Sequence, residues 1–207
     1  MFLVWRQDGH SPFYVAPRVG INEKDFNMVK LRSMIVDADK SGVDSTGSSD
    51  LRITPIGSFI RKYKLDELTQ LWNVLIGDMS LVGPRPNVKR ETDLYTNIEK
   101  GLLKVKPGIT DLASIIFSDE GDILADKSDP DLSYNQLIRP WKSRLGLIYI
   151  ENMNFFLDIK IIFYTAVSIL NRDTSITWVV NILKIYNSDE ELIKVSRRNK
   201  ELYPHPP

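Results

Sequence analysis

The sequence predicts an α+β fold that is rich in helix and has a few short strands, on two observations. Residues 1–35 mix short apolar runs with turn residues, which is typical of short strands or hairpins. Farther along, apolar residues recur at helical spacing, as at Leu68, Leu71, Trp72 and Leu75. At 207 residues the chain is long enough for one well-buried domain and a small appendage.

Local signals predict the elements of the middle of the chain in order. Residues 37–55 are rich in Asp, Ser and Gly, which predicts a polar loop. A helix is expected over 56–63, and a second helix is expected to begin near Asp66 and to end at Gly77. A further helix is expected over 88–103, because the next strong break is a Pro-Gly pair.

The C-terminal half is expected to be mostly helical. The acidic stretch 117–133 predicts a surface loop, followed by helices over 134–151 and 155–170. Residues 178–186 form an amphipathic stretch. The segment 188–191, Ser-Asp-Glu-Glu, has the spacing of a capping box and is expected to open a charged final helix.

Composition argues against several classes of function. Lys plus Arg and Asp plus Glu both total 27, so no global field attracts nucleic acid. The chain has no cysteine and only two histidines, which excludes disulfides and thiolate metal sites and argues against a histidine-rich metal centre. The apolar run 161–170 is about half the length that a membrane-spanning helix needs, so we expect contact with a bilayer surface at most.

Two adjacent carboxylates, Asp66 and Glu67, stand at the entrance of the second predicted helix. One could hold Mg²⁺, which prefers oxygen ligands, while the other attacks a phosphorus atom to form an aspartyl-phosphate type of intermediate. The alternative interpretation is an acidic first turn that only complements the helix dipole.

Cationic residues flank this pair along the chain. Arg61 precedes it, and Arg85 follows it between two prolines that restrict the backbone. Arginine binds phosphate through two parallel hydrogen bonds, although a solvated surface arginine is the alternative. Lys106 beside a turn could bind phosphate or be exposed. Lys30 and Arg32 would share one face of a strand, which could be a ligand-facing edge or a solvated one.

Eight blocks in the same order resemble the bacterial sugar transferases of the monotopic phosphoglycosyl transferase family. The most specific pair is Leu-Asp-Glu-Leu followed by Gly-Asp-Met-Ser and Gly-Pro-Arg-Pro. The matching blocks, which together cover roughly residues 12–171, are 17–20, 30–34, 53–57, 64–73, 77–86, 106–110, 149–152 and 156–160.

The resemblance implies transfer of a sugar-1-phosphate from a nucleotide diphosphate sugar to polyprenyl (undecaprenyl) phosphate, which primes polysaccharide or glycoconjugate synthesis. It implies Asp66 as the nucleophile and Glu67 as the partner linked to Mg²⁺. The candidate phosphate-binding residues are Arg61, Arg85 and Lys106, with Arg18, Lys30 and Arg32 as further candidate substrate contacts.

The resemblance also implies a compact domain with helices at the membrane interface. We expect a catalytic domain over 1–171 and an amphipathic, charged helical extension over 172–207. Helices over 155–170 and 178–186 would contact lipid headgroups, with packing into the core as the alternative. The implied location is the cytoplasmic face of the inner membrane, with partial solubility for a shortened chain and other glycan-assembly enzymes as candidate partners.

Several features depart from the family pattern. Only Met1–Trp5 remains of the N-terminal hydrophobic segment that members carry, so we expect a truncated version. Lys106 stands where many members have arginine, Gly146 where many have aspartate, and residues 110–114 replace a Thr-Gly-Trp-like continuation. We interpret these changes as marks of a subgroup with a different donor.

Two other hypotheses remain open. The chain could be an inactive remnant that binds partners in a glycan-assembly complex, which the short N-terminus motivates. It could instead be a soluble Mg²⁺-dependent phosphotransferase or phosphatase that uses Asp66 on phosphates without lipid.

Overall fold

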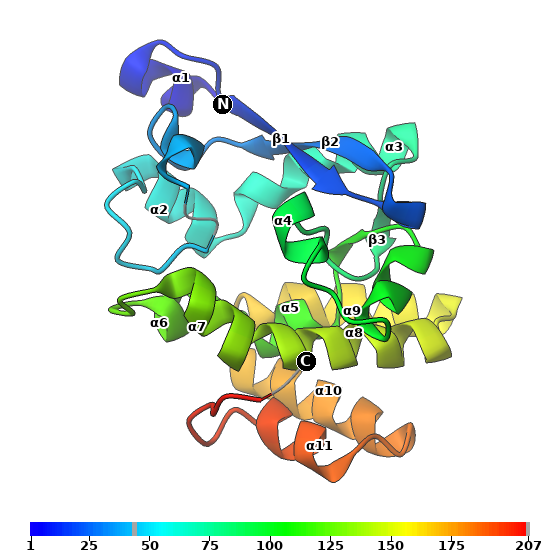
Figure 1. Ribbon diagram of the computed structural model, residues 1–207. Helices are drawn as coiled ribbons and strands as arrows, with labels where there is room; N and C mark the ends of the chain where they lie inside the picture. Colours follow the sequence, from blue (N-terminus) through cyan, green and yellow to red (C-terminus); the bar gives the residue numbers. More distant parts are fainter. Residues whose placement is uncertain (43–44, 206–207) are drawn as a thin grey trace.

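The computed structural model describes residues 1–42 and 45–205. Two small sheets lie on one side of a layer of helices (Figure 1), so the predicted α+β fold with few short strands is confirmed. The antiparallel sheet consists of β1 (Phe13–Val19) and β2 (Asp25–Leu31), and the parallel sheet of β3 (Ser80–Val82) and β4 (Gly108–Thr110).

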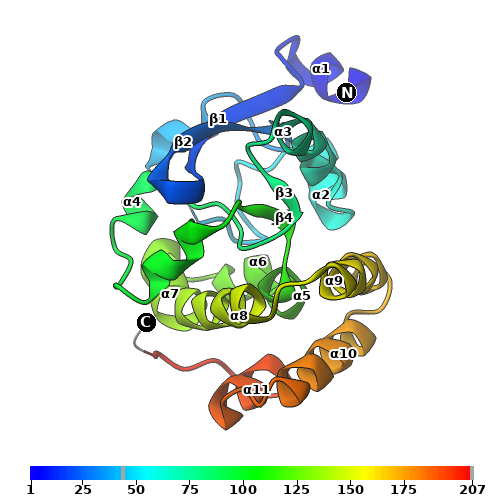
Figure 2. The same cartoon turned by 90° about the vertical axis from the view of Figure 1, so that its right-hand side faces the viewer.

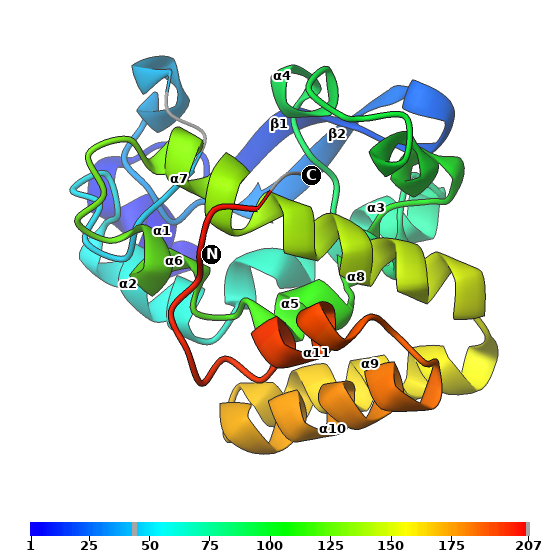
Figure 3. The same cartoon turned by 60° about the horizontal axis from the view of Figure 1, so that its bottom comes forward.

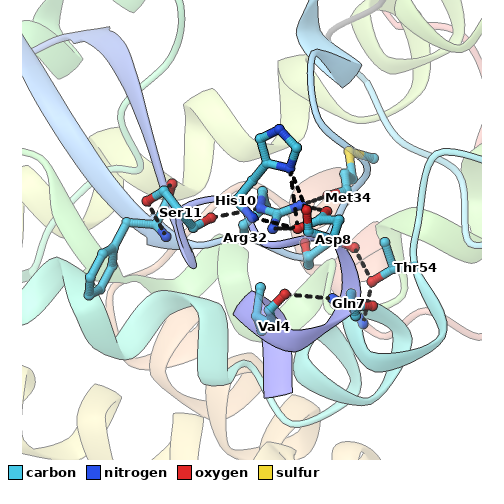
Figure 4. A network of polar contacts seen from close by, with 11 residues as sticks. Val4, Gln7, Asp8, His10, Ser11, Arg32, Met34 and Thr54 are labelled. Atoms are coloured by element: carbon cyan, nitrogen blue, oxygen red, sulfur yellow. Dashed lines mark hydrogen bonds and ion pairs between the residues drawn. The ribbon is translucent and has the colours of Figure 1, made fainter. Parts of the chain in front are cut away.

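The strand prediction for residues 1–35 is correct for the hairpin but wrong for the first residues, which form helix α1 (Phe2–Asp8). Gly9 ends α1 in the left-handed conformation at φ 72°, which glycine adopts without strain. Arg32 donates two hydrogen bonds of 2.6 and 2.7 Å to the Asp8 carboxylate and one to the Ser11 carbonyl (Figure 4). These contacts attach α1 to the hairpin and hold the pKa of Asp8 well below its usual range.

Strand β2 is fixed by side chains from the elements that follow the carboxylate pair. The buried Asn73 amide accepts from Val29 N–H at 3.0 Å and donates to Asn27 O at 2.8 Å, and Thr69 Oγ1 donates to Val29 O at 3.0 Å. These side chains thereby hydrogen-bond backbone groups of Asn27 and Val29 at the outer edge of β2, in place of a third strand. The same bonds bring Lys30 beside the predicted site.

The helices around the carboxylate pair begin and end close to the predicted positions. Thr54 caps the first one by accepting from Gly57 N–H at 2.9 Å, and Gly77 ends the last one at φ 91°. The polar loop contains a short 3₁₀ turn, and its residues 43–44 lie outside the described part of the chain. The elements are η1 (Ile21–Glu23), η2 (Ala38–Ser41), α2 (Pro55–Lys62), η3 (Leu65–Gln70) and α3 (Leu71–Ile76).

The single helix predicted over 88–103 is wrong, because two short pieces form there: α4 (Lys89–Thr92) and η4 (Glu99–Lys104). The buried Glu99 carboxylate accepts from both the backbone N–H and the hydroxyl of Thr96. These bonds stabilise a turn in place of a helix interior.

The acidic stretch is more helical than predicted, since Asp111 and Asp129 cap helices at either side of it. Its elements are α5 (Leu112–Ile116), α6 (Glu120–Leu124) and the start of α7 (Pro130–Leu137). The helix predicted over 134–151 is divided at Ile138, after which α8 (Arg139–Asn152) begins. Pro140 has no N–H to donate to the Gln136 carbonyl, and His205 N–H donates to that carbonyl at 3.1 Å instead.

The core lies between the helices of the lower layer. Leu112, Ile115, Trp141, Leu145 and Ile161 are all fully buried there. Figure 3 shows α10 (Arg172–Ile185) beside α9 (Phe155–Ser168), with α11 (Glu190–Ser196) next to α10.

The segment 172–207 contributes to this same core. Val179, Val180, Ile182 and Leu183 are buried, so the expectation that 178–186 contacts lipid headgroups is wrong and core packing holds. The capping residue of α11 is Asp189, which accepts from two backbone N–H groups, rather than Ser188. In the described part of the chain, no helix is long and apolar enough to cross a bilayer.

We expect Leu183→Ala to destabilise the whole protein, because it removes a fully buried side chain that α10 contributes to the shared core. The expected loss is about 2–5 kcal/mol of unfolding free energy. Urea denaturation followed by circular dichroism would measure it. Ile185→Ala, at a 71% exposed position of the same helix, is the control and should change little. Two separate unfolding transitions, with only one of them shifted, would show that the C-terminal segment folds independently.

Candidate active site

A cavity of about 1360 Å³ lies between the hairpin side of the molecule and the helical layer. Seven of the predicted site residues line it: Arg18, Lys30, Arg32, Arg61, Asp66, Glu67 and Arg85, the last from the loop after β3. Segments far apart in the sequence thus meet at one hollow, as expected for a binding site.

The carboxylate pair lies in the first turn of η3, directly after a sharp change of chain direction. Lys64 makes that turn in the left-handed conformation at φ 52°. Arg85 forms a bidentate ion pair with Glu67, with Nη2–Oε1 at 2.9 Å and Nη1–Oε2 at 3.2 Å. It also donates to the Ile109 carbonyl of β4. The arginine between prolines therefore fixes the orientation of Glu67.

Asp66 is the less constrained member of the pair. It is half-buried, and its carboxylate makes no hydrogen bond or ion pair with any described residue. Burial raises its pKa, Lys30 works in the opposite direction, and Glu67 adds to the rise. Asp66 is thus a partly desolvated carboxylate that lines the cavity together with Arg61 and Arg85.

The environment shifts the two pKa values in opposite directions. Burial works to raise the pKa of Glu67, but Arg85, with help from Lys30 and Lys64, outweighs it and holds that pKa below its usual value. Neighbouring carboxylates with pKa values shifted apart can take different roles in one reaction. Glu67 is therefore the more readily ionised of the two, and Asp66 is the more easily protonated.

Two lysines complete the cationic side of the cavity. Burial lowers the pKa of Lys30 to about 8, with Arg85 acting in the same direction. Sequence reasoning missed Lys64, which is half-buried, has its pKa lowered chiefly by burial, and donates to Ser114 O at 3.4 Å. Its position just before the Leu-Asp-Glu-Leu motif was the available signal.

The remaining candidates divide into cavity residues and outliers. Arg61 lies in the cavity wall, with Nη1 3.5 Å from Ser33 Oγ. The guanidinium of Arg32 is paired with Asp8, so the geometry gives no support to its predicted substrate contact. Lys106 is exposed and lies outside the cavity, beside Gly77, so the geometry gives no support to its predicted phosphate contact.

The Asp66 and Glu67 carboxylates suit a Mg²⁺ ion that is also bound by substrate phosphates. Among the described residues, no group of three or more Asp, Glu, His or Cys side chains surrounds a common point. Mg²⁺ in phosphate-handling sites is commonly held by one or two carboxylates together with substrate phosphates and water. Asp66 and Glu67, with their oxygens beside a cavity, match that arrangement.

Comparison with known proteins gives a consistent result. The sequence profile described as bacterial sugar transferase matches residues 1–172. The chain is 38% identical over 153 residues to a UDP-glucose:undecaprenyl-phosphate glucose-1-phosphate transferase of Klebsiella pneumoniae, covering 72% of this chain and 30% of that protein. It is 35% identical over 191 residues to an undecaprenyl-phosphate galactose phosphotransferase of Salmonella typhimurium, covering 84% and 37%.

A shorter relative is an uncharacterized sugar transferase of Bacillus subtilis, 36% identical over 162 residues, which cover 78% of this chain and 71% of that protein. The chain spans only about a third of the length of the two longer relatives.

We expect Lys30 to titrate near pH 8, because burial disfavours its charged form. NMR of ¹³C-labelled lysine side chains would give the midpoint, against about 10.4 for an ordinary lysine. Glu67→Gln removes a neighbouring negative charge that raises this pKa, so the midpoint should fall further. Asp93→Asn, at an exposed position, should leave it unchanged. A midpoint at the ordinary value would contradict the desolvated position of Lys30.

Proposed function

Because the chain belongs to the bacterial sugar transferase family, we propose that it moves a sugar-1-phosphate from a UDP-sugar to undecaprenyl phosphate. The names of the relatives supply the donor and acceptor classes, and the site supplies the chemistry. The observation that carries the proposal is the unpartnered Asp66 carboxylate in the cavity, beside a Glu67 that Arg85 holds in place.

Asp66 acts in two displacement steps. In the first, its carboxylate attacks the phosphorus that carries the sugar, and the bond to the nucleotide breaks to release uridine monophosphate. In the second, a phosphate oxygen of undecaprenyl phosphate attacks the phosphorus of the aspartyl adduct. The sugar diphospholipid forms, and Asp66 leaves as a carboxylate. No proton needs to be removed from either nucleophile, because both are anions when they attack.

The cations of the cavity supply binding and charge stabilisation. Lys30, Lys64 and Arg61 offer ammonium and guanidinium donors to the diphosphate. Arg85 keeps Glu67 ionised and oriented. Mg²⁺ held by Glu67 and the diphosphate would neutralise charge that builds up on the departing phosphate.

An exposed apolar surface offers a place for the lipid acceptor. Figure 2 shows α1, α2, α3 and α9 along one side of the molecule. We define the apolar face as the exposed large side chains of α1, α3 and α9: Phe2, Leu3, Trp5, Leu71, Trp72, Leu75, Ile76, Phe155, Phe156, Ile159 and Phe163.

Helix α9 both packs and exposes apolar residues, since Leu157 and Ile161 enter the core while Phe155 and Phe156 are more than two-thirds exposed. Apolar patches of this kind mark interaction surfaces. We assign the apolar face to the membrane because the proposed acceptor is a lipid. The cytoplasmic leaflet of the inner membrane is its proposed location, since nucleotide sugars are made in the cytoplasm.

We expect Asp66→Asn to abolish the covalent adduct and to lower turnover by roughly 10³-fold or more, because the amide is a far weaker nucleophile. Intact-protein mass spectrometry after incubation with UDP-sugar and Mg²⁺, without lipid, would detect a mass gain equal to one phosphosugar. Asp93→Asn, an exposed carboxylate outside the cavity, is the matched control and should retain the adduct.

Three results would distinguish the alternatives. An adduct that persists in Asp66→Asn would exclude this residue as the nucleophile. Repeated turnover without lipid, with release of many equivalents of uridine monophosphate per protein, would favour a soluble phosphotransferase, because the proposed reaction stops after one equivalent when the acceptor is absent. No release from any UDP-sugar, with a folded protein and lipid present, would favour a partner-binding role.

We expect Trp72→Glu and Leu75→Glu to weaken binding to phosphatidylethanolamine–phosphatidylglycerol vesicles by about tenfold each, because each removes an apolar side chain from the apolar face. Vesicle co-sedimentation would measure the change. Leu132→Glu is the control, because Leu132 is similarly exposed but belongs to α7 on another side of the molecule (Figure 2). Equal effects of all three changes would argue against a specific membrane face.

A further inference from the structure

Asp111 is a buried carboxylate of the cavity wall that the proposed chemistry does not use. It is 3% exposed and stands at the N-terminus of α5. Its Oδ1 accepts two hydrogen bonds of 2.6 Å, from the backbone N–H and the hydroxyl of Ser114. Its Oδ2 makes no hydrogen bond or ion pair with any described residue, although Asp111 lines the cavity. One oxygen is therefore fixed and the other is available.

The surroundings place Asp111 close to the phosphate-handling groups. Burial works to lower the pKa of Arg85, and Glu67 and then Asp111 more than offset it. Asp111 also acts on Lys64, whose Nζ donates to the carbonyl of the same Ser114 that Asp111 caps. A ligand phosphate held by Lys64 would thus have the free Asp111 oxygen as a near neighbour.

The chemistry of that oxygen limits what it can bind. A carboxylate only accepts hydrogen bonds, and it repels the phosphate itself. Because accepting is the only hydrogen-bonding role open to this oxygen, a ligand group that contacts it should be a donor. Beside the phosphates, a nucleotide sugar offers such donors as hydroxyls, on the transferred sugar on one side and on the ribose on the other.

We propose that Asp111 Oδ2 accepts a hydrogen bond from a hydroxyl group of the bound nucleotide sugar, and so helps to determine which donor the protein takes. This inference rests on the proposed function. It also gives a role to residues 110–114, which depart from the Thr-Gly-Trp-like continuation common in the family, where a glycine would offer no side-chain acceptor. A site built to hydrogen-bond a hydroxyl discriminates strongly against analogues that lack it.

The variant Asp111→Asn tests the contact with a defined geometry. The Ser114 N–H needs an acceptor, so the amide oxygen should occupy the Oδ1 position and turn the NH₂ group into the cavity. A donor then replaces the acceptor that the hydroxyl needs. We expect affinity for the nucleotide sugar to fall by about tenfold to a hundredfold. A purely electrostatic role predicts the opposite sign, because loss of a negative charge favours an anionic ligand.

Isothermal titration calorimetry on the full chain would compare UDP with UDP-glucose, UDP-galactose and UDP-N-acetylgalactosamine. Asp129→Asn is the matched control, since Asp129 caps α7 through Leu132 N–H at 2.9 Å but does not line the cavity. Weaker binding of a UDP-sugar with unchanged binding of UDP would assign the contact to the sugar. Equal weakening of both would assign it to the ribose. Unchanged or tighter binding of all four ligands would overturn the proposal.

Deoxygenated ligands test the same contact in the unmodified protein, and so cover the case in which Asp111→Asn does not fold. Single-deoxy analogues of the tightest UDP-sugar, and the 2′-deoxyuridine form, should include one that loses about tenfold or more. If every analogue binds as well as its parent, the contact does not exist. Turnover with undecaprenyl phosphate is measured separately in the unmodified protein. If that protein shows no turnover but its affinity for UDP-sugars still depends on Asp111, the transfer reaction is refuted and the Asp111 contact is not.

Discussion

The ion pair between Glu67 and Arg85 is the interaction on which the site depends. It joins η3 to the loop after β3, and the further bond from Arg85 to Ile109 O extends the connection to β4. Glycine at position 108 permits β3 and β4 to approach this closely, because a Cβ there would lie 2.1 Å from Gly83 N. The elements of the cavity wall near the carboxylates are therefore linked to one another without a ligand, an arrangement that favours catalysis by preorganised charge.

The same ion pair makes the pKa values of the two adjacent carboxylates differ. Arg85 offsets burial at Glu67, whereas at Asp66 burial prevails and the neighbouring Glu67 charge adds to it. Glu67 remains a fixed anion, and the carboxylate of Asp66 makes no hydrogen bond or ion pair with any described residue. Charge distribution within one short turn thus produces the functional asymmetry.

The positions at which this chain departs from the family pattern have different surroundings in the structure. Gly146 packs against Leu102 and Pro84, where a Cβ would come within 2.7 Å of Leu102 Cδ2, so the aspartate common in relatives has no room here unless Leu102 moves. Lys106 is exposed and does not line the cavity, so the lysine at that position does not alter the cavity lining. The Asp111 carboxylate, by contrast, does line the cavity.

The sequence by itself determined the elements that local signals control. Turn residues and helical spacing predicted the hairpin, the start of α2 and the end of α3, and short motifs pointed to Glu67 and Arg85, which the structure joins in an ion pair. Tertiary structure decided what depends on distant partners. Arg32, a candidate ligand contact, pairs with Asp8 and joins α1 to the hairpin. Glu99 accepts hydrogen bonds from Thr96 where a continuous helix was predicted. The apolar face of α10 packs into the core. Burial and long-range hydrogen bonds set these outcomes, and neither can be read from local sequence.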